Sequence, residues 1–211
     1  DKSITIRLLD IGGDKQLSYL PLPRETDPAL GARGVRFLLK HPELLDRQLR
    51  VLLRLAEDFD IQIMAPMVTL ADEMRRVRIA LEAAARETGH TTLPKLGAMV
   101  ETPAAALCAD ELAESSDFFN IGTNDLTQYT MAAGRENDSA SGYYIEDHAA
   151  IFRLIRHVSR ESGDLPVGIC GDLASRPEAV EPLIQAGMHL LSVPPMLIPS
   201  IKETVRASSV V

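Results

Sequence analysis

Two carboxylates follow apolar stretches of the chain and could bind a divalent cation. Glu101 comes directly after the run LGAMV at 96–100, and Asn124 and Asp125 come shortly after FFNIG at 118–122. Carboxylate oxygens are hard ligands, and Mg²⁺ takes one or two of them together with substrate phosphate and water. The alternative is that Glu101 is an acid of a first helical turn and that Asn124 or Asp125 caps a helix.

Four basic residues could together hold a phosphate group: Arg7, Lys15, Arg33 and Arg135. Arg7 stands among apolar residues, where a guanidinium is costly unless it meets an anion. The alternative partner of Arg7 is Asp10 or Asp14. The other three basic residues lie in expected loops, where such side chains are usually solvated. Beside a magnesium site, the four would form a clamp for a phosphoryl group.

Cys170 ends the apolar run 166–170 between two glycines and could act as an acid or a nucleophile. The alternative for Cys170, and our expectation for Cys108, is a small buried apolar side chain. The two cysteines form no CxxC pair, and the five histidines show no HxH or HExxH spacing. These patterns indicate neither a zinc site, nor a disulfide framework, nor a histidine-based triad.

Six stretches with strand character alternate with helical patterns along the chain. The expected strands are 4–9, 61–64, 96–100, 118–121, 166–170 and 189–193. The expected helices include 43–57, 69–88, 103–114, 126–131, 149–160 and 195–207, with a further helix after residue 175. We expect Pro66 to close the second strand, and the Thr69 hydroxyl and Gly89 to bound the second helix. We also expect Thr102 to cap the third helix, and Ser175 with Glu178 to form a capping box.

Alternating strands and helices predict a parallel α/β fold. A doubly wound sheet would gather polar residues at one switch point and favour a GxGxxG turn, which is absent. Here reactive groups follow nearly every strand, which favours a (β/α)8 TIM barrel. Six strands are fewer than eight. We therefore expect residues 1–211 to be a single barrel domain that is incomplete at its N-terminus.

The composition of the 211 residues is that of an ordinary globular domain, with 45% apolar and 25% charged residues. No apolar run reaches the roughly 18 residues that span a bilayer, and the first residues are unlike a signal peptide. We expect a cytoplasmic protein without a membrane segment. A net charge of −8 and no tryptophan also argue against nucleic-acid binding.

The chain resembles the phosphoenolpyruvate (PEP)-utilising enzymes in four stretches that occur in the family's order. They are RLLDIGGDK at 7–15, MVETP at 99–103, GTNDLTQYT at 122–130 and GICGDLA at 168–174. Within the family, DIGGDK and GDLA are most similar to enzyme I of the sugar phosphotransferase system. The alternatives are the barrel of a pyruvate phosphate dikinase or PEP synthase, and a regulatory paralogue that senses PEP.

The resemblance implies a role for each matching residue. The substrate-binding residues would be Arg7, Lys15, Arg33, Asn124, Asp125 and Arg135, with the arginines on the phosphate and Asn124 on the carboxylate. Glu101 and Asp125 would bind Mg²⁺. Cys170 would be the catalytic acid that protonates the enolate of PEP to give pyruvate.

The resemblance also implies partners. The phosphoryl group would pass to a histidine on an N-terminal domain, absent here, and then to a small phosphocarrier protein, and the barrel would form a homodimer. The chain departs from the family most in the segment 139–150, and also at Asn120, at Gly134, at Asp172 and at the pair 175–176. We expect the divergent segment to alter dimerisation or lid behaviour without abolishing binding.

Overall fold

The computed structural model describes residues 2–13 and 25–208. Lys15 therefore lies outside the described residues. The chain divides into two compact units, one formed by Asp1–Met99 with Ser115–Phe118 and the other by Val100–Glu114 with Phe119–Val211. Among the residues that the structure describes, no helix combines the length and apolar character that a membrane span requires.

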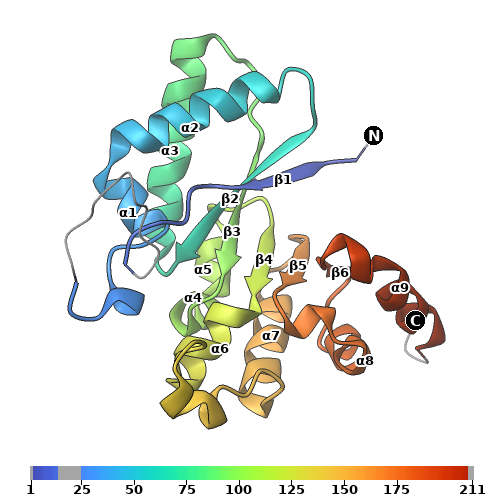
Figure 1. Cartoon of the computed structure of the whole chain (residues 1–211). Coiled ribbons are helices and arrows are strands. Elements are labelled where there is room, and N and C mark those ends of the chain that lie inside the picture. The colour runs from blue at the N-terminus through green and yellow to red at the C-terminus, as the bar shows by residue number, and fades with distance from the viewer. Residues whose placement is uncertain (1, 14–24, 209–211) are drawn as a thin grey trace. The chain divides into compact units, whose positions relative to one another are not determined.

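The first unit holds three strands and the helices that follow them. Its elements are β1 (Ile4–Arg7), η1 (Pro28–Leu30), α1 (Val35–Lys40), α2 (Pro42–Leu55), β2 (Ile61–Val68), α3 (Ala71–Thr88) and β3 (Lys95–Val100), where η denotes a 3-10 helix. β1 and β2 pair in parallel from Ile4 opposite Ile61 to Arg7 opposite Met64. Helices α2 and α3 lie side by side (Figure 1).

Leucines at helical spacing explain why α2 packs on its neighbours. Leu45, Leu49, Leu52 and Leu53 are all buried, while the rest of the helix carries most of the charge. α3 ends at Gly89, which adopts the left-handed conformation with φ 79° and donates its N–H to the Ala85 carbonyl. The predicted helices over these residues are confirmed.

Pro66 does not close the second strand as predicted, because β2 continues to Val68. The ladder between β1 and β2 ends at Met64, whose carbonyl accepts the N–H of Leu8 over 2.8 Å. Pro66 therefore lies beyond the residues of β2 that β1 pairs with, so its missing N–H costs no bond to β1.

The predicted cap of α3 is also wrong. The hydroxyl of Thr69 does not cap the helix; it accepts a bond from Arg36 Nη2 over 3.0 Å. Instead the carboxylate of Glu73 accepts the backbone N–H groups of Thr69 and Leu70 over 2.7 and 3.0 Å. The carboxylate of Glu73, an acid in the first turn, thus caps the start of α3, and the Thr69 hydroxyl does not.

The second unit contains the remaining strands, each of them followed by a helix. Its elements are α4 (Pro103–Leu107), α5 (Ala109–Ala113), β4 (Phe119–Gly122), α6 (Thr123–Met131), η2 (Asp138–Tyr143), α7 (Ala149–Glu161), β5 (Val167–Cys170), η3 (Leu173–Ser175), α8 (Pro177–Gln185), β6 (Leu190–Leu191), η4 (Pro195–Leu197) and α9 (Ile198–Ala207). β4 pairs with β5, and β5 with β6, both in parallel.

The single helix predicted over 103–114 is two short helices that meet at Cys108. Cys108 has φ −110° and ψ 39°, outside the helical region, and is exposed. The expectation that Cys108 is a small buried side chain is therefore wrong. Thr102 does cap α4 as predicted, because its hydroxyl oxygen accepts the N–H of Ala105 over 3.2 Å.

The predicted capping box at Ser175 is absent. Arg176 is the N-cap residue of α8 and makes no side-chain cap bond, and the Ser175 hydroxyl donates to the Gly171 carbonyl over 3.5 Å. The expected α/β class is confirmed nonetheless. In each unit the strands follow one another in chain order, as in a (β/α)8 barrel.

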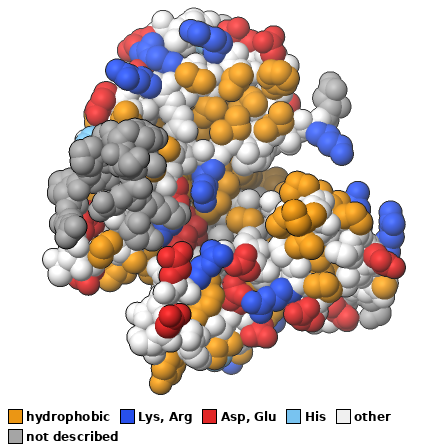
Figure 2. Space-filling view, in the orientation of Figure 1, with side chains coloured by type: hydrophobic (Ala, Val, Ile, Leu, Met, Phe, Trp, Pro, Cys, Tyr) orange, Lys and Arg blue, Asp and Glu red, His pale blue; other side chains and the backbone are white. Residues whose placement is uncertain are grey.

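Acidic and basic side chains are interspersed on the face of the molecule seen in Figure 2. A nucleic-acid backbone favours a continuous basic surface. A small anion requires only a few clustered arginines, and the sites below have such clusters.

Candidate functional site

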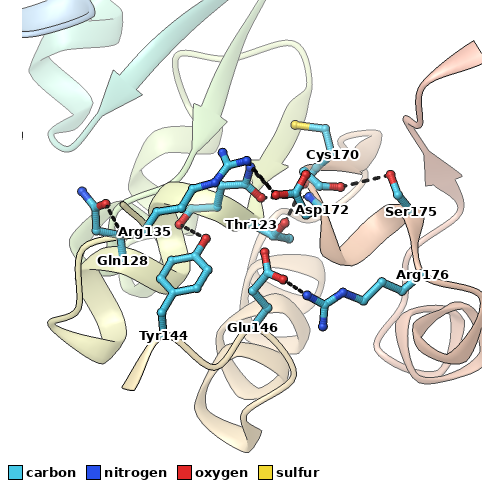
Figure 3. A network of polar contacts seen from close by, with 11 residues as sticks. Thr123, Gln128, Arg135, Tyr144, Glu146, Cys170, Asp172, Ser175 and Arg176 are labelled. Carbon is cyan, nitrogen blue, oxygen red and sulfur yellow. Dashed lines mark hydrogen bonds and ion pairs between the residues drawn. The ribbon is translucent and has the colours of Figure 1, made fainter. Parts of the chain in front are cut away.

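Asn124, in the first turn of α6, contacts Asp172, in the segment that follows β5. The backbone N–H of Asp172 donates to Asn124 Oδ1 over 2.8 Å, and Asn124 Nδ2 donates to Asp172 Oδ2 over 3.4 Å. Arg135 Nη2 lies 2.9 Å from the same carboxylate oxygen (Figure 3). Both ends of the Asn124 amide thus have protein partners, which fix its orientation. Its predicted bond to a substrate carboxylate remains a prediction.

The backbone at Gly171 explains why the segment after β5 approaches the start of α6 so closely. Gly171 has φ +103°, and a Cβ atom there would lie 2.2 Å from Thr123 Oγ1 and 2.7 Å from Asn124 Oδ1. The Thr123 hydroxyl also donates to the Cys170 carbonyl over 3.0 Å. A glycine after Cys170 is therefore needed both for the turn and for the contact with α6.

We expect Gly171→Ala to lower the free energy of unfolding by about 3 kcal/mol or more, because backbone strain and a steric clash add. The matched control is Gly163→Ala, which has φ +60° but no atom within 4 Å of the added Cβ. This control should lose about 1 kcal/mol of unfolding free energy, from backbone strain alone. Urea denaturation measures both losses, and equal losses would contradict the close contact between Gly171 and Asn124.

The two predicted metal ligands both lie in the second unit. Glu101 is buried and precedes Thr102, the N-cap of α4, so it is not an acid of the first helical turn. Asp125 lies in the first turn of α6, whose N-cap is Gly122, so neither Asn124 nor Asp125 caps that helix. The alternative explanations offered for these residues are therefore wrong.

The chemistry of Glu101 and Asp125 fits a hard divalent cation. Each supplies carboxylate oxygens, and α4, which follows Glu101, contacts α6, which carries Asp125. Within residues 2–13 and 25–208, no three His, Cys, Asp or Glu side chains gather as a metal cluster. Mg²⁺ needs fewer protein ligands than that, because it keeps several waters and binds substrate phosphate. Magnesium binding here remains a prediction.

Arg7 and Arg33 share one carboxylate in the first unit. Arg33 is 1% exposed, and its Nη2 and Nε lie 3.2 and 3.4 Å from the two oxygens of Asp10. The expectation that Arg33 is a solvated loop residue is therefore wrong: the buried aspartate compensates its charge. Arg7 Nη1 lies 3.8 Å from Asp10 Oδ2, which confirms one of its two alternative partners. The Arg7 side chain is 44% exposed and remains accessible to an anion.

Cys170 is the last residue of β5 and is partly exposed. The alternative interpretation of Cys170 as a small buried apolar side chain is therefore wrong. Figure 3 shows Cys170 near Asp172 and Arg135, at the end of the strand where a barrel collects its reactive groups. This position suits the predicted role of Cys170 as an acid.

Tyr144 and Glu146 were not among the predicted site residues, and both lie in the segment 139–150 that departs most from the family. The Tyr144 hydroxyl donates to the Asn124 carbonyl over 3.1 Å. Burial raises the pKa of Tyr144 well above its usual range, and the neighbouring negative charge of Glu146 raises it further. The phenol thus stays protonated and keeps its donor. Asp172 was also missed, although it follows a strand end as Glu101 does.

Comparison with known proteins gives matches over nearly the whole chain. Residues 1–210 match the family model described as PEP-utilising enzyme, PEP-binding domain. A multiphosphoryl transfer protein of Xanthomonas campestris is 43% identical over 97% of this chain and 25% of its own length. Phosphoenolpyruvate-protein phosphotransferases of Haemophilus influenzae and Buchnera aphidicola are 41% and 38% identical, over 95% and 99% of this chain.

The chain spans only 25% to 38% of the length of these curated relatives. Among solved structures, a citrate lyase of Burkholderia xenovorans matches with a TM-score of 0.59 and 18% identity, over 75% of this chain and 53% of that one. That likeness concerns the fold alone. Together with the parallel strands in chain order, it supports an incomplete (β/α)8 barrel, because the described residues contain six strands.

Proposed function

Because the chain belongs to the PEP-utilising enzyme family and matches its PEP-binding domain, we propose that it binds PEP as the barrel domain of a phosphoenolpyruvate-protein phosphotransferase. The observation that carries this proposal is the cluster of Asn124, Arg135 and Asp172 beside Cys170. It combines a guanidinium that can bind phosphate with a thiol that can donate a proton, at the carboxyl ends of β4 and β5.

The proposed reaction breaks the bond between phosphorus and the enol oxygen of PEP. The phosphoryl group passes to a histidine nitrogen on another domain, and the bonding electrons stay on the enolate oxygen. The Cys170 thiol then protonates the methylene carbon to give pyruvate, and the thiolate recovers a proton from water. Arg135 would bind the phosphate, and bound Mg²⁺ would offset charge on the phosphate and enolate oxygens.

Glu101 and Asp125 would hold the metal, and Asn124 would orient the substrate carboxylate. Arg7 and Arg33 of the first unit, together with Lys15, are further proposed phosphate ligands. Of the two arginines, Arg7 is the more exposed, so it is the better candidate for direct contact.

Two relatives are named phosphoenolpyruvate-protein phosphotransferases, which supports a protein as the phosphoryl acceptor. We propose a histidine-bearing domain as the phosphoryl acceptor and a small phosphocarrier protein as the next acceptor. We also propose a second copy of the barrel as a dimer partner. The setting would be the cytoplasmic part of sugar transport by the phosphotransferase system.

Calorimetric titration of the chain with PEP tests the proposal directly. We expect binding in the presence of Mg²⁺ and at least about tenfold weaker binding with EDTA, because a highly charged anion would otherwise face two carboxylates. Glu101→Gln should weaken the binding and remove most of its metal dependence. Glu111→Gln, on the exposed surface of α5, is the control and should change neither.

The outcomes separate two parts of the proposal. Absence of PEP binding to the unchanged chain would overturn the proposed function. Equal affinity with and without Mg²⁺, or an unaffected Glu101→Gln variant, would overturn the metal assignment while leaving PEP as the ligand.

A further inference from the structure

The loop between α6 and α7 has an unusual pattern of burial. Of residues 134–148, all of them described, Glu146 is the one that is buried, with 5% exposure. The apolar side chains of Tyr143 and Ile145, on either side of Tyr144, are 70% and 40% exposed. The buried Ala133 anchors the start of the loop, but residues 134–148 bury no apolar side chain. They gain little from the hydrophobic effect, so polar contacts must hold them in place.

The buried carboxylate of Glu146 forms an ion pair with Arg176, which follows η3 (Figure 3). Its Oε2 accepts from Arg176 Nη2, and its other oxygen, Oε1, has no hydrogen-bond partner among the described residues. A buried carboxylate requires a compensating cation, because removal from water is costly. Arg176 therefore determines where this end of the loop can lie.

A second ion pair attaches the start of the loop to the segment 172–176, which also contains Arg176. In this pair the loop supplies the cation and the segment supplies the anion. Arg135, near the start, contacts Asp172, whereas Glu146, near the end, contacts Arg176. The backbone N–H of Arg135 also donates to Gln128 Oε1 over 3.2 Å. Two ion pairs with reversed charges allow only one alignment of the loop on the segment 172–176.

The two ion pairs differ in how easily a ligand can replace them. The side chains of Arg135 and Asp172 are 51% and 55% exposed, so an incoming phosphate can take over the guanidinium at little cost. The Glu146 side chain is only 4% exposed and cannot give up its partner so readily. The Glu146 pair would therefore persist when Arg135 turns to a ligand.

We infer that Glu146 and Tyr144 are positioning residues that hold the 134–148 loop against η3 and α6 and so keep Arg135 in place to bind the phosphate of PEP. The inference rests on the proposed function. Glu146 acts through Arg176, and Tyr144 acts through the hydrogen bond of its phenol to the Asn124 carbonyl.

A double-mutant cycle tests the inference with the 211-residue chain. PEP affinity in Mg²⁺ is measured by calorimetry for Glu146→Gln, for Arg176→Gln and for the double variant. If each single change leaves the loop ordered in about a tenth of the molecules, PEP affinity falls about tenfold. The double variant should bind no more weakly than Arg176→Gln alone, because both changes break one pair.

Two further variants refine the test. Tyr144→Phe removes one hydrogen bond and keeps the ring, and we expect a loss of affinity of about threefold. Glu161→Gln is the matched control. Glu161 is partly exposed and forms an ion pair over 2.8 Å with its exposed neighbour Arg160 on α7, outside the 134–148 loop, so PEP affinity should not change.

Hydrogen exchange supplies a second readout. We expect faster exchange in residues 134–148 of Glu146→Gln, with α6 and α7 unchanged. Faster exchange across those helices as well would indicate general destabilisation and overturn the positioning role. So would a double variant about a hundredfold weaker than the unchanged chain. If the unchanged chain binds PEP and Glu146→Gln binds it with equal affinity, this inference alone is overturned. Absence of PEP binding to the unchanged chain would overturn the proposed function and this inference with it.

Discussion

Replacing Cys170 with serine is expected to slow pyruvate formation from PEP at least about a hundredfold while PEP affinity stays within about twofold. A thiol of ordinary pKa about 8.5 donates a proton to a carbanion far more readily than a serine hydroxyl does. The substitution changes one atom and removes no group proposed to bind substrate. Turnover and binding should therefore separate.

The measurement compares pyruvate release with calorimetric PEP affinity, with the proposed histidine-bearing acceptor domain supplied to the chain. Cys108→Ser is the matched control. Since Cys108 is exposed where α4 meets α5, we expect that change to affect neither turnover nor stability. If Cys170→Ser retains its turnover, or loses binding in place of turnover, Cys170 is not the proton donor.

Arg135→Met is expected to weaken PEP binding by about a hundredfold. The guanidinium can donate two parallel hydrogen bonds to phosphate oxygens, and loss of a charge-assisted contact costs about 1.5–3 kcal/mol. The loss is increased because Asp172, which now neutralises Arg135, would remain as an uncompensated negative charge beside the phosphate. The effect should be larger than that of Glu146→Gln or Tyr144→Phe, because Arg135 is proposed to touch the ligand itself.

Arg153→Met, at an exposed position of α7, is the control for the change in net charge and should leave PEP affinity unchanged. Arg135→Lys keeps the charge but cannot donate two parallel hydrogen bonds to the phosphate. Its PEP affinity should therefore lie between those of Arg135→Met and Arg153→Met. Equal PEP affinity in Arg135→Met and Arg153→Met would rule out Arg135 as a phosphate ligand. The PEP-binding proposal itself would survive that result.

Elements whose causes are local were predicted from the sequence alone. The leucines of α2 repeat at helical spacing and all are buried, Gly89 ends α3, and Thr102 caps α4. Each depends on residues within a few positions of one another, so periodicity and capping preferences suffice to find it. Together with the reactive groups at strand ends, these elements were enough to predict the parallel α/β class. The family was predicted separately, from four stretches of sequence that resemble the PEP-utilising enzymes.

Predictions failed where a residue's surroundings depend on distant parts of the chain. Pro66 continues a strand because the β1 ladder has already ended, and Arg33 is buried because Asp10, 23 residues earlier, compensates its charge. Cys108 is exposed because the expected helix is divided at that residue. None of these facts can be read from local spacing.

The sequence by itself determined the order of strands and helices and the types of residue that end the strands. Only the tertiary structure decided which of those residues meet. Asn124 contacts Asp172 across 48 positions of sequence, and Glu146 contacts Arg176 across 30. Tyr144 and Glu146 lie in a segment with no regular pattern, and their partners are reached only when β4 and β5 pair in parallel and bring the loops that follow them together. Side-chain pairing of this kind depends on strand register and loop path, which no local pattern of residues specifies.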